Sequence, residues 1–281
     1  MSSIKDRQRA AARARLEKEM AERAATARRR RQRQAAVGAG LALLLIVGGT
    51  VWLVTAMGDD SDGTPPGAAA PPPGMTSCFW NTDGGPPSPQ IKDVGVPPTN
   101  VPNVGARVMT INTNLGPIEA QLDLAKVPCT AASFTHLGSK KFFDNSKCHR
   151  LVKVNDANNK FNVLQCGDPS ATGKGYRETD GTGGPTYRFA EENLPVSEQP
   201  PYPEGVIAMA NTGQPNTSGS QFFIVFDDTN LDPAYTVLGK ITKGMEIVKQ
   251  VGAAGHDNAF AQQAGGGHPK KELVLETLRV A

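Results

Sequence analysis

A polar amide stands directly before an apolar strand in the segment NTGQPNTSGSQFFIVF (211–226). Alternate side chains of a strand face opposite sides, so Gln221 shares one face with Phe223, while Phe222 and Ile224 share the other. Both faces therefore carry large apolar groups. The pattern indicates that this strand borders a second apolar surface besides the core, and that an amide lies at the edge of that surface.

The sequence contains no residue pattern typical of metal binding, phosphate binding or serine hydrolysis. The four histidines, at 136, 149, 256 and 268, show no ligand spacing and the cysteines include no CxxC pair, so the sequence predicts no metal site. The stretch GTGG (181–184) lacks the lysine of a phosphate-binding loop and is typical of a turn or loop. No Gly-x-Ser-x-Gly elbow of a serine hydrolase occurs.

The positive charge is concentrated at the N-terminus. Residues 1–34 hold twelve Lys or Arg against four Asp or Glu, a net charge of +8, so the rest of this chain of net charge +3 carries −5. A folded part that is not basic argues against nucleic-acid binding. The basic segment has strong helix propensity. It could lie on anionic lipid or simply be a solvated charge run that orients the chain.

Residues 35–57 contain no charge over 23 positions, which predicts a single transmembrane helix that anchors the chain in the cytoplasmic membrane. A buried core helix is disfavoured because the segment is apolar on all sides. A cleavable signal peptide is disfavoured because 34 residues precede the segment. The arginines at 28–33 and the acidic GDDSDG at 58–63 place the N-terminus in the cytoplasm and the C-terminal part outside.

All four cysteines follow this apolar segment and would lie on the outer side, where disulfides persist. They are Cys78, Cys129, Cys148 and Cys166. Two bridges are therefore favoured over four free thiols. Residues 58–105, rich in Pro, Gly, Ala, Ser and Asp, are predicted to form an extended linker, with the island CFWN (78–81) docked onto the domain.

The folded domain is predicted to span 106–281. A hairpin is expected over 106–123, a helix over 130–138 with Thr130 as N-cap and Gly138 as its end, and a second helix over 243–252. Short strands are expected at 148–152, 161–167, 205–211, 221–226, 235–242 and 272–280. Many short strands with two helices favour a mainly β fold, an antiparallel barrel plugged at its ends.

Four motifs occur in a specific order: HR (149–150), QCGDP (165–169), NTSGSQFFI (216–224) and LGKI (238–241). In this order they resemble the cyclophilins, a family of peptidyl-prolyl cis–trans isomerases, over essentially all of 106–281. The resemblance implies an eight-stranded antiparallel barrel capped by two helices, with the active groove on its outer surface and no cofactor. The N-terminal anchor and Pro-rich linker are similar to those of membrane cyclophilins of actinobacteria.

The resemblance also implies the site residues. Arg150 matches the catalytic arginine, and Phe223 would line the pocket for the substrate proline ring with Gln221 at its border. The other residues implied to bind substrate are His149, Val163, Gln165, Ala210, Asn211, Leu231 and Tyr235.

The chain also departs from the family pattern. The pocket phenylalanine of the family aligns with Asn162, one position from Phe161, and a slip or bulge in register would bring Phe161 into the pocket. The tryptophan that grips cyclosporin in many members aligns with Asn230, so weak cyclosporin binding is expected. Tyr235 replaces the groove histidine of those members, and Cys166 replaces a glycine.

A Cys129–Cys148 bridge would pin the first helix against the strand that carries Arg150, which leaves Cys78 to pair with Cys166. The favoured function is isomerisation of X–Pro bonds in exported or cell-surface polypeptides. The alternative is a cyclophilin-fold module or chaperone that binds Pro-containing segments with little turnover.

Overall fold

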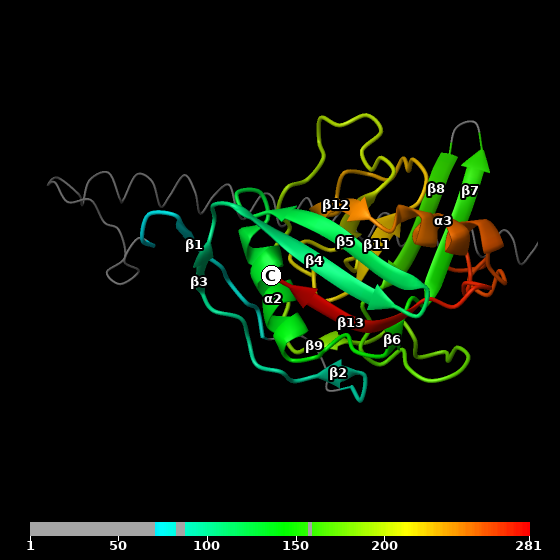
Figure 1. The fold of residues 1–281 in the computed structure, drawn as a ribbon, viewed down its shortest axis with the longest axis horizontal. Coiled ribbons are helices and arrows are strands. Elements are labelled where there is room, and N and C mark those ends of the chain that lie inside the picture. Colours follow the sequence, from blue (N-terminus) through cyan, green and yellow to red (C-terminus); the bar gives the residue numbers. More distant parts are fainter. Residues whose placement is uncertain (1–70, 83–87, 157–158) are drawn as a thin grey trace, which may run out of the picture. The chain divides into compact units, whose positions relative to one another are not determined.

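The computed structural model describes residues 71–82, 88–156 and 159–281, all within one compact unit, residues 69–281 (Figure 1). The predicted basic helix at 1–34 and transmembrane helix at 35–57 lie outside the described residues. Within the described part, no helix has the length and apolar character needed to cross a bilayer.

One curled antiparallel sheet of nine strands forms the body of this unit, in the order β6-β13-β4-β5-β12-β10-β11-β8-β7. The strands are β4 (Ala106–Thr113), β5 (Gly116–Asp123), β6 (Ser146–Lys147), β7 (Arg150–Asp156), β8 (Asn159–Cys166), β10 (Val206–Met209), β11 (Phe222–Val225), β12 (Val237–Lys243) and β13 (Val274–Val280). The two edge strands, β6 and β7, are separated in the chain by only Cys148 and His149. The sheet therefore curls until its two edges meet at this junction.

The mainly β architecture with two helices is confirmed, but the strand count is nine rather than eight. The strand predicted at 148–152 begins only at Arg150, because Cys148 and His149 lie between β6 and β7 and bond to different neighbours. The amide of Cys148 bonds to the carbonyl of Leu273, whereas the amide of His149 bonds to the carbonyl of Gln165. The predicted hairpin at 106–123 is confirmed as β4 and β5, which are in register from end to end.

The first helix, α2 (Pro128–Ser139), begins earlier than predicted because Pro128 occupies its first turn. Thr130 is inside the helix and is not the N-cap. Its amide, its hydroxyl and the amide of Cys129 donate instead to the carboxylate of Glu192, at 2.7–3.1 Å. Gly138 does not end the helix either. A Cβ there would lie 3.0 Å from the carbonyl of Leu278, so glycine allows α2 to approach β13 closely.

Apolar side chains on the concave face of the sheet meet those of the two helices. Phe134 and Leu137 of α2, and Val248 and Val251 of α3 (Met245–Ala254), are buried in this core. Phe222 and Ile224 of β11 point into it as well. A second, smaller cluster on the other face contains Val163, Tyr202, Ala208, Phe223 and Val225. The two apolar faces predicted for residues 221–226 thus belong to two different clusters.

The described part of residues 71–105, which we expected to be linker, packs onto the domain as three short strands. β1 (Met75–Ser77) pairs with β3 (Asn100–Pro102), and β2 (Ile91–Lys92) pairs in parallel with β9 (Gly184–Pro185). The island at 78–81 docks as expected. Trp80 packs edge-on against Tyr187 and Phe189, with ring centroids 5.5 Å apart in both cases.

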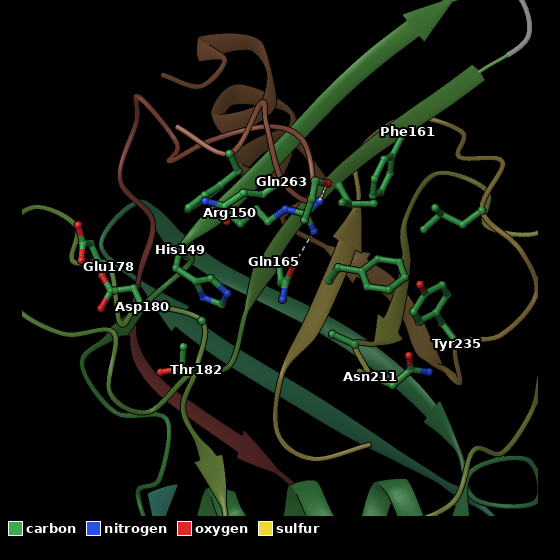
Figure 2. A pocket seen from close by; sticks show the side chains of 17 residues that line it. His149, Arg150, Phe161, Gln165, Glu178, Asp180, Thr182, Asn211, Tyr235 and Gln263 are labelled. Atoms are coloured by element: carbon green, nitrogen blue, oxygen red, sulfur yellow. Dashed lines mark hydrogen bonds between the residues drawn. The ribbon is translucent and has the colours of Figure 1, made fainter. Parts of the chain in front are cut away.

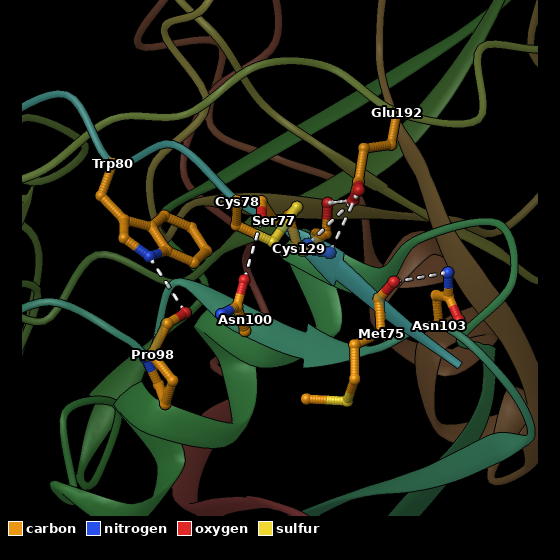
Figure 3. Close-up of a disulfide and its surroundings, with 10 residues drawn as sticks. Met75, Ser77, Cys78, Trp80, Pro98, Asn100, Asn103, Cys129 and Glu192 are labelled. Carbon is orange, nitrogen blue, oxygen red and sulfur yellow. Dashed lines mark hydrogen bonds between the residues drawn. A yellow bond between two sulfur atoms is a disulfide. The ribbon is translucent and has the colours of Figure 1, made fainter. Parts of the chain in front are cut away.

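The predicted disulfide pairing was wrong. The two bridges are Cys78–Cys129, which ties the N-terminal segment to the start of α2 (Figure 3), and Cys148–Cys166. Arg150 and Gln165 are register partners in the antiparallel β7–β8 pair. Cys148 precedes the first by two residues and Cys166 follows the second, so strand pairing brings these two cysteines side by side.

Candidate active site

A cavity of about 420 Å³ lies over the second apolar cluster. Ten of the eleven predicted site residues line it: His149, Arg150, Phe161, Val163, Gln165, Ala210, Asn211, Phe223, Leu231 and Tyr235. Figure 2 shows Phe161 and Tyr235 on one side of the cavity and His149 on the other, with Arg150 and Gln165 between them. The sequence motifs, far apart in the chain, therefore converge on one place.

The floor of this cavity is aromatic. Phe223 is buried and meets the rings of Tyr202 and Tyr235 edge-on, with centroids 5.9 and 5.6 Å away. Tyr202 is fixed because its hydroxyl accepts from the amide of Tyr235 at 3.0 Å. A rigid aromatic floor of this kind suits a small apolar ring.

Arg150 is held at the cavity wall by hydrogen bonds that all three nitrogens of its guanidinium donate. Nη1 donates to Oε1 of Gln165 at 3.0 Å, Nε donates to the carbonyl of Gly265 at 3.1 Å, and Nη2 donates to the carbonyl of Ala264. The guanidinium carbon also lies 5.7 Å from the centroid of the Phe161 ring. Burial lowers the pKa of Arg150 below the ordinary range of an arginine, but an arginine remains a cation in proteins.

Gln221 is the one predicted residue that does not line this cavity. Its Nε2 donates to the carbonyls of Gly181 and Gly183 at 2.7 and 2.9 Å, and its Oε1 accepts from Gln165 at 2.9 Å. The amide at the edge of the strand is thus committed to protein partners. It connects Gln165, and through Gln165 the guanidinium of Arg150, to the backbone of the GTGG stretch.

Phe161 lines the cavity without a bulge in β8. The β7–β8 register is continuous from Asn159 to Gln165, so Phe161, Val163 and Gln165 share the cavity face by simple alternation. Asn162 points the other way and is fully buried, with Nδ2 donating to Oδ1 of Asn155 at 2.7 Å. The slip in register that we considered is not needed.

His149 is buried beside Arg150, and neither of its ring nitrogens has a hydrogen-bond partner in the part of the chain that the structure describes. Burial lowers the pKa of His149 from 6.5 to about 4, and the cation of Arg150 acts in the same direction. The carboxylates of Asp168 and Asp180 oppose this shift but are outweighed. His149 is therefore a neutral imidazole at pH 7, lining the cavity with free hydrogen-bonding capacity.

Sequence reasoning missed the cavity residues that come from two loops: Glu178, Asp180, Gly181 and Thr182 from one, and Phe260, Gln263 and Ala264 from the other. The first loop is held by Asp168, whose carboxylate accepts from the amides of Gly181 and Gly183 at 2.6 and 3.2 Å. The GTGG stretch was a usable signal for this loop. The second loop carries no periodicity or motif that points to a site. No cluster of metal-ligating side chains occurs among the described residues.

The fold and the site together define a class of protein, a curled antiparallel β sheet that carries an aromatic-floored pocket beside a fixed arginine on the face opposite its main core. Residues 108–280 match the family model described as cyclophilin type peptidyl-prolyl cis-trans isomerase/CLD. The chain belongs to this family.

Several curated proteins are similar. "Probable peptidyl-prolyl cis-trans isomerase B" of Mycobacterium leprae is 40% identical over 197 residues, which cover 66% of this chain and 60% of the relative. Its Mycobacterium tuberculosis H37Rv counterpart is 40% identical over 207 residues, covering 69% and 61%. Peptidyl-prolyl cis-trans isomerase CYP18-2 of Arabidopsis thaliana is 33% identical over 152 residues, covering 53% and 83%. The chain thus spans about three fifths of the mycobacterial relatives.

Among solved structures, a Cryptosporidium parvum cyclophilin-type peptidyl-prolyl cis-trans isomerase aligns with a TM-score of 0.49 at 24% identity. The alignment covers 63% of this chain and 98% of that one. The same protein in the presence of the dipeptide Ala-Pro aligns with a TM-score of 0.48 at 24% identity, covering 62% and 98%.

Proposed function

We propose that this protein catalyses the cis–trans isomerisation of X–Pro peptide bonds. The observation that carries the proposal is the fixed guanidinium of Arg150 beside an apolar cavity floored by Phe223. Phe223, Val163 and Leu231 are the right size and polarity to hold a proline ring, and the cation is close enough to act on the bond at its nitrogen.

The chemistry needs no covalent step, cofactor or proton transfer. An X–Pro bond resists rotation with a barrier of about 20 kcal/mol because the prolyl nitrogen shares its lone pair with the carbonyl. A guanidinium that donates toward this nitrogen localises the lone pair and gives the C–N bond single-bond character. Arg150 is oriented for this before substrate arrives, since three protein acceptors already hold it.

One hydrogen bond does not supply the whole acceleration. A gain of about 10⁵ in rate requires lowering the barrier by about 7 kcal/mol, whereas a hydrogen bond to a charged group contributes about 1.5–3 kcal/mol. The shape of the cavity must contribute the remainder by binding the twisted bond better than either planar isomer. The rigid packing of Phe223 between two tyrosines supports this second contribution.

A protease-coupled assay with an X–Pro peptide tests the proposal on the full chain. Arg150→Ala should lower kcat/KM by about two orders of magnitude, whereas Arg107→Gln, which removes an arginine far from the cavity lining, should have no effect. If Arg150→Ala and the unaltered protein show the same turnover, the enzyme proposal fails. Retained peptide binding would then support the alternative, a Pro-segment binding module or chaperone.

We further propose that residues 35–57 anchor the protein in the cytoplasmic membrane with the isomerase domain outside, where it acts on exported or cell-surface polypeptides. The uncharged segment, the N-terminal arginines and the two disulfides support this location. Protease added to intact spheroplasts should digest the domain, and protection of the domain would contradict this topology. Asn230 supports the expectation of weak cyclosporin binding.

A further inference from the structure

A second cavity of about 290 Å³ adjoins the proline cavity. The two share walls made by Gln165, Gly181, Thr182, Ala210 and Asn211. Figure 2 shows Thr182 and Asn211 at the lower edge of the first cavity, with Gln165 above them. An extended peptide advances about 3.3 Å per residue. A peptide that crosses the shared wall with its proline in the first cavity therefore places a neighbouring side chain over the second.

The second cavity contains one cationic side chain, that of Arg188. Its guanidinium lies between the backbones of Gly184 and Gly219. A Cβ built on either glycine would lie 3.4 Å from a guanidinium nitrogen, an ordinary van der Waals distance, so the guanidinium packs directly against both backbones.

Arg188 uses only part of its hydrogen-bonding capacity. Nη1 donates to the carbonyls of Pro185 and Tyr187 at 2.6 and 2.8 Å. Its Nη2 and Nε donate to no acceptor among the described residues, where Arg188 also takes part in no ion pair. The side chain is half-buried, and burial lowers the pKa of Arg188 below the ordinary range of an arginine. A partly desolvated cation with unused donors is poised for an anion.

The wall that carries Arg188 is held from behind by the N-terminal segment. The backbone of Arg188 exchanges two hydrogen bonds of 2.8 Å with Asn81, and β2 pairs with Gly184–Pro185 of β9. The Cys78–Cys129 bridge fixes this segment three residues before Asn81. The position of the guanidinium is therefore set before a peptide binds.

We propose that this second cavity binds the carboxylate of an aspartate or glutamate close to the proline of the substrate polypeptide. No acidic side chain belongs to the part of its lining that the structure describes, so Arg188 has no competing carboxylate there. Hydroxyls of Thr182, Thr212 and Thr217 lie around the same space and suit carboxylate oxygens. The inference rests on the proposed isomerase function and adds a substrate preference to it.

Matched peptides test this preference on the full chain. The two peptides of a pair are identical except at one position, which is Glu in one and Gln in the other. Across the pairs, this position moves through the three residues on either side of a single X–Pro bond. At the preferred position kcat/KM for the Glu peptide should exceed that for the Gln peptide about tenfold, the factor that 1.4 kcal/mol produces. Because the contact is ionic and half-exposed, the ratio should fall as salt is raised.

Three variants distinguish an effect of Arg188 on this Glu-to-Gln ratio from an effect of the overall charge of the protein. Arg188→Gln should bring the ratio near one, Arg188→Lys should keep part of it, and Arg107→Gln should leave it unchanged. Equal turnover of Glu and Gln peptides at all positions by the unaltered protein would overturn the inference without affecting the proposed isomerase. If neither peptide is turned over, the isomerase proposal fails. The ratio of the two dissociation constants, measured by NMR titration, then decides the inference by itself, with equal constants overturning it.

Discussion

Arg150 and Gln165 face each other across the β7–β8 pair, and Nη1 of the arginine donates to Oε1 of the glutamine at 3.0 Å. Nε2 of the same glutamine donates to Gln221 at 2.9 Å, and Gln221 is anchored on two backbone carbonyls. The orientation of the guanidinium therefore depends on an amide that is itself fixed by a third residue. Three motifs that are separate in the sequence are therefore joined in one hydrogen-bond network.

Replacing Gln165 should reveal this dependence. Gln165→Leu keeps the size of the side chain but removes the acceptor of Arg150, which costs about 2 kcal/mol of positioning, or roughly 30-fold in kcat/KM. Gln165→Glu keeps the acceptor and should retain more activity than the leucine variant. Steady-state kinetics with one X–Pro peptide measures both. Equal activity of the leucine variant and the unaltered protein would contradict the positioning role.

Removal of one disulfide should mainly lower stability, whereas removal of the other should mainly lower activity. In the chain-entropy model the Cys78–Cys129 bridge, which spans 51 residues, contributes about 4 kcal/mol, and Cys148–Cys166, which spans 18, contributes about 3 kcal/mol. Only the second joins the strands that carry Arg150 and Gln165. Removing Cys148 and Cys166 together should therefore lower kcat/KM more, although it destabilises the fold less.

Urea unfolding and peptide turnover on the two double-alanine variants check this ranking. Each variant serves as the control for the other, since both lose one bridge and two sulfur atoms. If the variant without Cys78 and Cys129 loses as much activity as the other while it is still folded, the Cys148–Cys166 bridge has no special role in positioning Arg150.

Phe161 and Asn162 are adjacent, yet their substitutions should act on different properties. Phe161→Ala removes an apolar wall of the cavity and should lower kcat/KM about fivefold to tenfold with little loss of stability. Asn162→Ala removes a buried amide that donates to Asn155 and to the carbonyl of Asp228, and should destabilise the fold by about 1–3 kcal/mol while turnover is largely kept. The reverse pattern would mean that β8 is shifted by one residue in solution.

His149 should make stability depend on pH. Its pKa is lowered to about 4 in the folded protein by burial, against an ordinary value of 6.5. Between these values the unfolded chain binds a proton that the folded chain does not, so stability is full above pH 6.5 and falls as the pH approaches 4. The loss should be on the order of 3 kcal/mol. Urea midpoints at several pH values should show this slope, and His149→Gln should reduce it. An identical slope in both proteins would exclude His149 as its origin.

Alternation and motif order were sufficient for much of the fold and site. The period-two pattern at 221–226 located both faces of β11, and NLGP located the first hairpin. These features depend on neighbouring residues, which a sequence displays directly. Phe161 could also have been placed by alternation from Gln165, because parity within one strand is a local property.

What could not be predicted depends on contacts between distant segments. Glu192 satisfies the first turn of α2 from 62 residues away, so the sequence near Thr130 does not show which group accepts the first amides of the helix. The carbonyls of Ala264 and Gly265 hold Arg150 through backbone atoms, which no residue type encodes. Cys129 is bonded to Cys78 because the N-terminal segment folds back onto α2. The Pro-rich composition of this segment does not specify that path.

Because the N-terminal segment folds back onto α2, it belongs to the smallest part of this chain that is expected to fold on its own. A truncated chain that starts at residue 106 would contain all nine strands of the large sheet and both described helices, but its Cys129 would lack a partner. The unpaired thiol could cross-link two molecules, and Arg188 would lose the backbone bonds that hold it against the second cavity. Residues 71–82 and 88–105 are thus a structural component of the isomerase domain, and the spacer toward the predicted anchor is correspondingly shorter.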